Sequence, residues 1–433
     1  MHRRNFLAVA AAASAATLAA GPLLAAPPRR GFPKGFLWGA ATSGHQVEGN
    51  NVTSDMWVME NVKPTLFQEA SGDADNSFQL WEVDLDLVRS IGLNSYRFSL
   101  EWARIEPEPG LFSIAMLDHY KAMIEGCRAR GLTPLVTFNH FTTPRWFAAR
   151  GSWYAPDSPD LFARYCDRAA RHLAAHIGYA TTLNEPNPSG DVLLPPAILQ
   201  KVAAMNAMAA RASGSGTFQS IPLSEADHVA RQKHFLEAHR QGRAAIKAAR
   251  TDLPVGVSLA MSDEQAQGSN RLRDSRRAVY YDAWLEAARS DDFLGVQNYT
   301  RNVWGDEGKL PPPAAAELNG TSEEIYPPSL ANVVRFAHQA TAVPIIVTEH
   351  GLCTDDDTQR AAFIPAALAE LHKTIAEGVP VMGYMHWSLL DNFEWVWGYK
   401  LRYGLCSVDR TTFRRAPKPS AHVLGAIARR NSV

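Results

Sequence analysis

Short apolar runs alternate with longer amphipathic stretches along this chain, and this alternation restricts the folds that it can adopt. Eight runs rich in Val, Ile, Leu and Phe have the length of strands, and we expect strands at Phe36–Ala41, Asn94–Ser99, Thr133–Asn139, Tyr179–Leu183, Pro254–Ala260, Phe293–Asn298, Pro344–Thr348 and Val381–Trp387. Helical spacing predicts helices at Leu80–Ser90, Met116–Arg130, Leu161–Ala175, His228–Arg250, Leu330–Gln339 and Gln359–Ala376. Strands that alternate with helices predict an α/β fold, here a single closed (β/α)8 TIM barrel.

One barrel accommodates the 433 residues, and no linker-like stretch divides them. We therefore expect a single barrel domain over residues 31–433. The polar stretches 211–224 and Pro311–Gly320 are expected to be loops, with short loops around 187–224 and 300–325.

The first residues have the pattern of an export signal. Arg3 and Arg4 precede an uncharged, Ala-rich stretch that ends in small residues before Pro27. The run Arg3-Arg4-Asn5-Phe6-Leu7 resembles a bacterial twin-arginine signal. We expect residues 1–26 to be removed and the protein to be periplasmic or secreted, without stable membrane anchoring. An uncleaved membrane anchor is the alternative interpretation of the same apolar stretch.

Composition excludes several classes of function. Lys and Arg number 43 and Asp and Glu number 44, so no general basic surface for nucleic acid is expected. The cysteines Cys127, Cys166, Cys353 and Cys406 show no Cys-x-x-Cys spacing, and His-Glu-x-x-His is missing from the sequence, so we expect no metal. Separate buried thiols are the favoured interpretation, and disulfide pairing of an exported protein is the alternative. We expect no cofactor.

Polar and aromatic residues follow the expected strands. In a (β/α)8 barrel the carboxyl ends of the strands form the active face. These ends carry Gln46, Arg97, His140, Asn184, Glu185, Tyr299, Glu349 and Trp387. We therefore expect a site at this rim.

Two glutamates at this rim suggest the chemistry. Glu185 lies in Asn184-Glu185-Pro186 after the fourth strand, and Glu349 in Thr348-Glu349-His350 after the seventh. Glycoside cleavage uses two carboxyl groups that flank one bond: one protonates the leaving oxygen, and the other attacks the anomeric carbon or activates water. The alternative is that both are ordinary surface or ion-paired glutamates.

Five motifs in order resemble glycoside hydrolase family 1, the β-glucosidase family, over nearly the whole chain after the signal. The resemblance rests on Phe36–Gly49, Leu93–Ser99, Thr182–Pro186, Thr348–Gly351 and the last-strand sequence Gly383–Trp395 with Arg402–Leu405.

The resemblance implies Glu185 as the general acid/base and Glu349 as the nucleophile of a retaining β-glycosidase that acts on small β-glycosides or oligosaccharides, and the signal pattern at residues 1–26 adds that the enzyme is exported. It also implies Arg97 and Tyr299 as supports of the nucleophile. The implied sugar-binding residues are Gln46, His140, Asn184, Glu394 and Trp395, with Trp387 as the platform beneath the sugar. Residues 31–433 are then the glycoside hydrolase catalytic domain.

The chain departs from the family pattern at a few positions. His350 follows the nucleophile where Asn is usual, Gln297 begins a Gln-Asn-Tyr run where Asn-Tyr-Tyr is common, and Phe141 and Glu323 replace tryptophans. Two other functions use the same features: a transglycosidase with the same glycosyl-enzyme intermediate, and a non-catalytic carbohydrate-binding barrel. The second is disfavoured because both Glu185 and Glu349 are present.

Overall fold

The structure is a computed structural model that describes residues 31–187, 196–219 and 225–433. The expected export signal at residues 1–26 lies outside the described residues.

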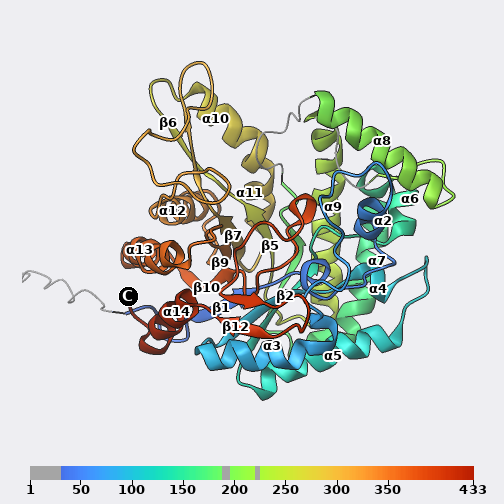
Figure 1. Ribbon diagram of the computed structural model, residues 1–433, viewed down its shortest axis with the longest axis horizontal. Helices are drawn as coiled ribbons and strands as arrows, with labels where there is room; N and C mark the ends of the chain where they lie inside the picture. Colours follow the sequence, from blue (N-terminus) through green and yellow to red (C-terminus); the bar gives the residue numbers. More distant parts are fainter. Residues whose placement is uncertain (1–30, 188–195, 220–224) are drawn as a thin grey trace, which may run out of the picture.

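Among the described residues, eight parallel strands close into a barrel in the ring order β1-β10-β9-β7-β5-β4-β3-β2 (Figure 1). Their bounds are Leu37–Ala41 (β1), Ser95–Ser99 (β2), Thr133–Asn139 (β3), Tyr179–Asn184 (β4), Val255–Ala260 (β5), Leu294–Asn298 (β7), Ile345–His350 (β9) and Val381–Trp387 (β10). Each lies within two residues of an expected strand. The predicted (β/α)8 barrel is confirmed.

Alternating side chains on β2 show how the sequence builds the barrel wall. Tyr96 and Phe98 belong to the large core cluster between strands and helices, whereas the buried Arg97 contacts residues of β4 and β9. Successive strand residues face opposite sides, so the residue between two outward-facing aromatics faces the barrel interior. A second apolar cluster fills that interior, with Leu37, Leu135, Phe293, Ile346, Met385 and Trp387 among its members.

Helices surround the strands in Figure 1. The longer ones are α3 (Ser77–Ile91), α5 (Ile114–Ala129), α7 (Ser158–Leu173), α8 (Pro196–Ala212), α9 (Glu225–Ala249), α12 (Ser329–Thr341), α13 (Asp357–Ala376) and α14 (Pro419–Arg430). The shorter ones are α1 (Gly44–Val47), α2 (Asp55–Asn61), α4 (Trp102–Ile105), α6 (Arg145–Ala149), α10 (Arg271–Arg277) and α11 (Ala283–Ala288). In α7 the buried residues Phe162, Cys166, Ala169 and Leu173 recur every three or four positions, which places one apolar stripe against the barrel.

Two parts of the expected layout are wrong. The segment expected to be a loop around 187–224 contains the helix α8, whose buried Met205 and Ala209 pack in a small cluster with Met56 and Met59 of α2. The segment 300–325 contributes β8 (Arg301–Trp304), which pairs in parallel with β6 (Asp263–Ala266) outside the barrel. A short antiparallel pair, β11 (Cys406–Val408) and β12 (Arg415–Pro417), precedes α14.

Irregular strand register occurs close to both glutamates. On β9, Val347 and Glu349 pair with the consecutive residues Val296 and Gln297 of β7, so β9 carries one extra residue. On β4, Thr181 and Asn184 pair with Gly256 and Ser258 of β5, again with one residue in excess. A bulge reverses the side that the following side chains face. Glu349 therefore turns into the barrel, while His350 stacks on Phe363 of α13 outside it.

All four cysteines are buried and unpaired, which confirms the interpretation as separate thiols. Within the described ranges, no helix combines the length and apolar character needed to cross a membrane.

Candidate active site

Glu349 at the end of β9 has two direct partners. Arg97 on β2 donates through Nη1 to Oε1 at 2.5 Å, and the Tyr299 hydroxyl donates to Oε2 at 2.6 Å. Only 4% of Glu349 is exposed. Burial raises the pKa of Glu349, whereas the guanidinium of Arg97 and the hydroxyl of Tyr299 oppose that rise by favouring the carboxylate.

Glu185 follows β4 in a different environment. Its backbone has a φ of 45°, which is uncommon for a residue with a side chain, and its N–H donates to the Ser258 carbonyl at 2.8 Å. Burial and the nearby charge of Glu349 raise the pKa of Glu185 to about 8, while Arg97 opposes them. Near neutral pH, therefore, Glu185 holds a proton in the same pocket in which Glu349 contacts a cation.

Asn184 connects the residues around the two glutamates. Its Oδ1 accepts from Arg97 Nη2 at 2.5 Å and from Gln297 Nε2 at 2.7 Å, and its Nδ2 donates to His140 Nε2 at 3.1 Å. Burial, with the charge of Arg97, lowers the pKa of His140 well below its usual value, so the imidazole is neutral. The amide of Asn184 is thus fixed in one orientation.

A second polar group lies across the rim around Glu394. Its Oε1 accepts from Trp387 Nε1 at 3.3 Å and its Oε2 from Gln46 Nε2 at 3.3 Å. Gln46 also donates to the carbonyl of Phe393 at 2.9 Å. Burial raises the pKa of Glu394 well above its usual value, because these two uncharged donors only partly offset desolvation.

Aromatic rings form the remaining wall. Trp395 stacks on His45 with centroids 5.6 Å apart and planes 4° apart, and on His140 at 6.5 Å and 16°. His140 also stacks on Trp387 at 5.7 Å. Flat aromatic faces beside amide and carboxyl groups suit a sugar, which has apolar C–H faces and a polar edge.

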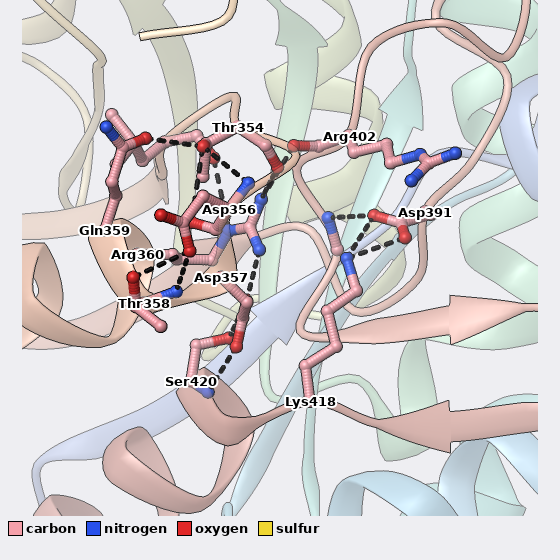
Figure 2. A network of polar contacts seen from close by, with 12 residues as sticks. Thr354, Asp356, Asp357, Thr358, Gln359, Arg360, Asp391, Arg402, Lys418 and Ser420 are labelled. Carbon is pink, nitrogen blue, oxygen red and sulfur yellow. Dashed lines mark hydrogen bonds and ion pairs between the residues drawn. The ribbon is translucent and has the colours of Figure 1, made fainter. Parts of the chain in front are cut away.

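A buried ionic network supports the loops on this side. Figure 2 shows Arg360 of α13 pointing toward the loops after β9 and β10, where it donates to the carbonyls of Thr354 and Arg402 at 2.9 and 2.7 Å. Lys418 pairs with Asp391 at 2.6 Å, and Asp391 also accepts from the Gly404 N–H at 2.9 Å. The segment between β10 and β11, which carries Glu394 and Trp395, is therefore tied to its surroundings at several points.

The structure brings the ten site residues singled out in the sequence to one rim of the barrel. Sequence reasoning noted Gln297 only as a departure and did not identify His45 or Glu101, although Glu101 lies just beyond the second strand as the other rim residues lie beyond theirs. His350 contributes nothing to the pocket: its Nδ1 lies 3.0 Å from the Tyr384 hydroxyl, and burial lowers its pKa to about 3.

The comparisons with known proteins agree with this geometry. Glycosyl hydrolase family 1 matches residues 29–197 and 288–433. Beta-glucosidase A of Thermotoga maritima is 27% identical, over 93% of this chain and 98% of its own. Among solved structures, beta-glycosidase BGL167 has 45% identity and a TM-score of 0.85 and covers 93% of this chain and 98% of its own, and beta-glucosidase 1317 has 40% identity and the same TM-score over 92% and 98%.

The chain belongs to glycosyl hydrolase family 1. The expectations of an enzyme, of this family and of its barrel fold are thereby confirmed.

Proposed function

We propose that the protein is an exported retaining β-glycosidase of the β-glucosidase type, with Glu349 as nucleophile and Glu185 as general acid/base. The observation that carries this proposal is the contrast between the two carboxyl groups. Glu349 contacts a guanidinium at 2.5 Å, whereas burial and the charge of Glu349 raise the pKa of Glu185 to about 8. One group is suited to attack and the other to donate a proton.

In the first step, an oxygen of Glu349 forms a bond to the anomeric carbon while the bond from that carbon to the leaving oxygen breaks. Glu185 transfers its proton to the leaving oxygen, which departs as a neutral alcohol. The loss of its proton makes Glu185 a carboxylate as Glu349 becomes an ester. Together the two side chains therefore carry one negative charge both before and after the step.

In the second step, Glu185 takes a proton from water, and the resulting oxygen attacks the anomeric carbon. The ester bond to Glu349 breaks and its carboxylate returns to Arg97 and Tyr299. Two inversions give net retention of the β configuration.

For the sugar, we propose that Gln46 and Glu394 bind hydroxyls at the edge of the ring far from the scissile bond, with Trp387 beneath it. The sugar also contacts the side chains of His140, Asn184 and Trp395 in this proposal. The hydrogen-bond partners of Glu394 are the uncharged Trp387 and Gln46, and the charges of Glu349 and Asp391 raise its pKa further. Neutral β-glucosides fit this environment, with β-galactosides or β-fucosides as weaker substrates, whereas a 6-phosphate would lose its hydration beside Glu394 without a cation among these partners to pair with.

Export remains part of the proposal and rests on Arg3 and Arg4 before the apolar segment. Replacing both arginines by lysine should leave the unprocessed protein in the bacterial cytoplasm. Normal processing and export of that variant would contradict the twin-arginine assignment.

The activity is tested with a panel of aryl β-glycosides that differ in the sugar, followed by proton NMR of the first-formed product. We expect the glucoside to be cleaved best and the β anomer to appear first. An initial α anomer would exclude the nucleophile role of Glu349. If no glycoside were cleaved, the alternative function, a non-catalytic carbohydrate-binding barrel, would be favoured instead. Adding an alcohol acceptor measures how much of the intermediate undergoes transglycosylation.

A further inference from the structure

A buried carboxylate, Glu101, has no part in the mechanism above. It lies two residues beyond β2, and only 1% of its surface is exposed. Desolvating a carboxylate costs free energy that hydrogen bonds and charges around it must offset. Its partners therefore indicate what the carboxylate holds in place.

Three donors converge on Glu101 from two segments: the loop after β1, which includes the short helix α1 (Gly44–Val47), and the loop after β3. Oε1 accepts from the His45 N–H of α1 at 3.1 Å. Oε2 accepts from Asn51 Nδ2 of the loop after β1 at 2.6 Å and from Thr142 Oγ1 of the loop after β3 at 2.7 Å. The packing is close, since a Cβ at Gly44 would lie 2.6 Å from Cγ of Glu101.

These two loops carry residues that face the proposed sugar site. His45 precedes Gln46, and its ring stacks on one side of Trp395. Two residues before Thr142, the ring of His140 stacks against Trp395 as well, and the Thr142 carbonyl accepts from Asn139 Nδ2 at 2.7 Å. The relative position of the two loops thus determines how the rings of His45 and His140 contact Trp395.

We propose that Glu101 is a positioning residue of the sugar-binding site, which it acts on by holding the loops after β1 and β3 at a fixed separation, so that His45 and His140 both stack on Trp395. The inference rests on the proposed function, because it assigns Glu101 to the binding of the same sugar. Glu101 touches neither the sugar nor the reacting atoms.

Charged groups around Glu101 shift its pKa. Burial and the charge of Glu48 raise the pKa of Glu101 to about 7, whereas the charge of His45, the hydrogen bond from Thr142 and the charge of Arg104 act to lower it. Arg104 is itself paired with Glu48 at 2.8 Å, and Glu60 lies 3.5 Å from His45. All three direct partners of Glu101 donate, so the ionised form satisfies them best. A glutamine there replaces one acceptor by an NH2 group that faces donors.

The test compares Glu101→Gln with Glu106→Gln. Glu106 is also fully buried and accepts from Trp102 Nε1 and the Gly110 N–H at 2.8 and 2.7 Å, and from the guanidinium of Arg164. Within the described residues, none of these three donors has a hydrogen bond or ring contact with the ten rim residues. Calorimetry measures binding of a gluco-configured sugar lactam to each folded variant. We expect Glu101→Gln to lose about tenfold in affinity, equivalent to about 1.4 kcal/mol, and Glu106→Gln to match the wild type.

With aryl glucosides, we expect Glu101→Gln to raise KM while the dependence of kcat on the leaving group stays that of the wild type, because Glu185 is untouched. Equal lactam affinity in Glu101→Gln and wild type would overturn the inference, as would an equal loss in Glu106→Gln. A wild type that neither binds the lactam nor hydrolyses glycosides would overturn the proposed function instead.

If Glu101→Gln does not fold, the Thr142 pair decides. Thr142→Val removes one donor to Oε2 with little change in volume, and Thr142→Ser keeps the hydroxyl. We expect weakened lactam binding in the first and recovery in the second. Equal binding by both would contradict the positioning role.

Discussion

Removing the Tyr299 hydroxyl should shift the pH dependence of the enzyme in a defined direction. In the structure this hydroxyl donates to Oε2 of Glu349 at 2.6 Å. A hydrogen bond to a charged group contributes about 1.5–3 kcal/mol, and one pKa unit corresponds to about 1.36 kcal/mol. Tyr299→Phe should therefore raise the pKa of Glu349 by about 1–2 units, because the lost bond had favoured the carboxylate. The contact with Arg97 at 2.5 Å remains.

Attack requires the ionised form of Glu349, so the acidic limb of kcat/KM should move to higher pH by the same amount. The assay is the pH profile of kcat/KM with an activated aryl glucoside, whose departure depends little on Glu185. Tyr403→Phe is the matched control, since its ring lies 5.8 Å from that of Tyr299 and its hydroxyl contacts Cys353. An acidic limb that stays in place in Tyr299→Phe, or moves to lower pH, would show that the Tyr299 hydroxyl does not stabilise the Glu349 carboxylate.

Three further predictions follow from the same geometry. Burial and the charge of Glu349 raise the pKa of Glu185 to about 8, and the protonated form is required, so kcat/KM should fall as pH rises through about 8. Glu185→Ala should abolish this alkaline limb and slow the cleavage of substrates with poor leaving groups most. Equal losses for good and poor leaving groups would contradict the acid role. Glu349→Gly should fold yet lose turnover by several orders of magnitude, with partial recovery on adding azide, and wild-type rates in the folded variant would end the nucleophile assignment. A 6-phospho-β-glucoside should be cleaved more slowly than its neutral counterpart, and faster cleavage of the phosphorylated sugar would contradict the role proposed for Glu394. Glu394→Gln should alter the preference between C4 epimers severalfold, as expected for one hydrogen bond of about 0.5–1.5 kcal/mol.

The barrel could be predicted from the sequence because its strands are buried on both faces. Such strands contain short runs of apolar residues, as in Ile345-Ile346-Val347 of β9 and in Val255–Ala260. The helix α8 escaped prediction for a related reason. Its buried Val202, Met205 and Ala209 have helical spacing, but they stand among other alanines and methionines, so no polar face marks the apolar one.

The two glutamates could be found in the sequence because local motifs surround them, but their orientation could not. Glu349 faces inward only because β9 carries an extra residue relative to its neighbours, and register is a property of paired strands. The role of Glu101 was equally hidden, since its side-chain partners His45, Asn51 and Thr142 lie on other loops, at distances of 41 to 56 residues along the chain.

The most direct test of the account is to trap the covalent intermediate. A 2-deoxy-2-fluoro-β-glucoside with a good leaving group should inactivate the enzyme, because the fluorine slows both formation and hydrolysis of the glycosyl ester, whereas the good leaving group speeds its formation alone. Mass spectrometry of the digested protein should then find one glycosyl group, on the peptide that contains Glu349. A modified peptide without Glu349, from an enzyme that hydrolyses β-glucosides with retention, would contradict the assignment of Glu349 as the nucleophile.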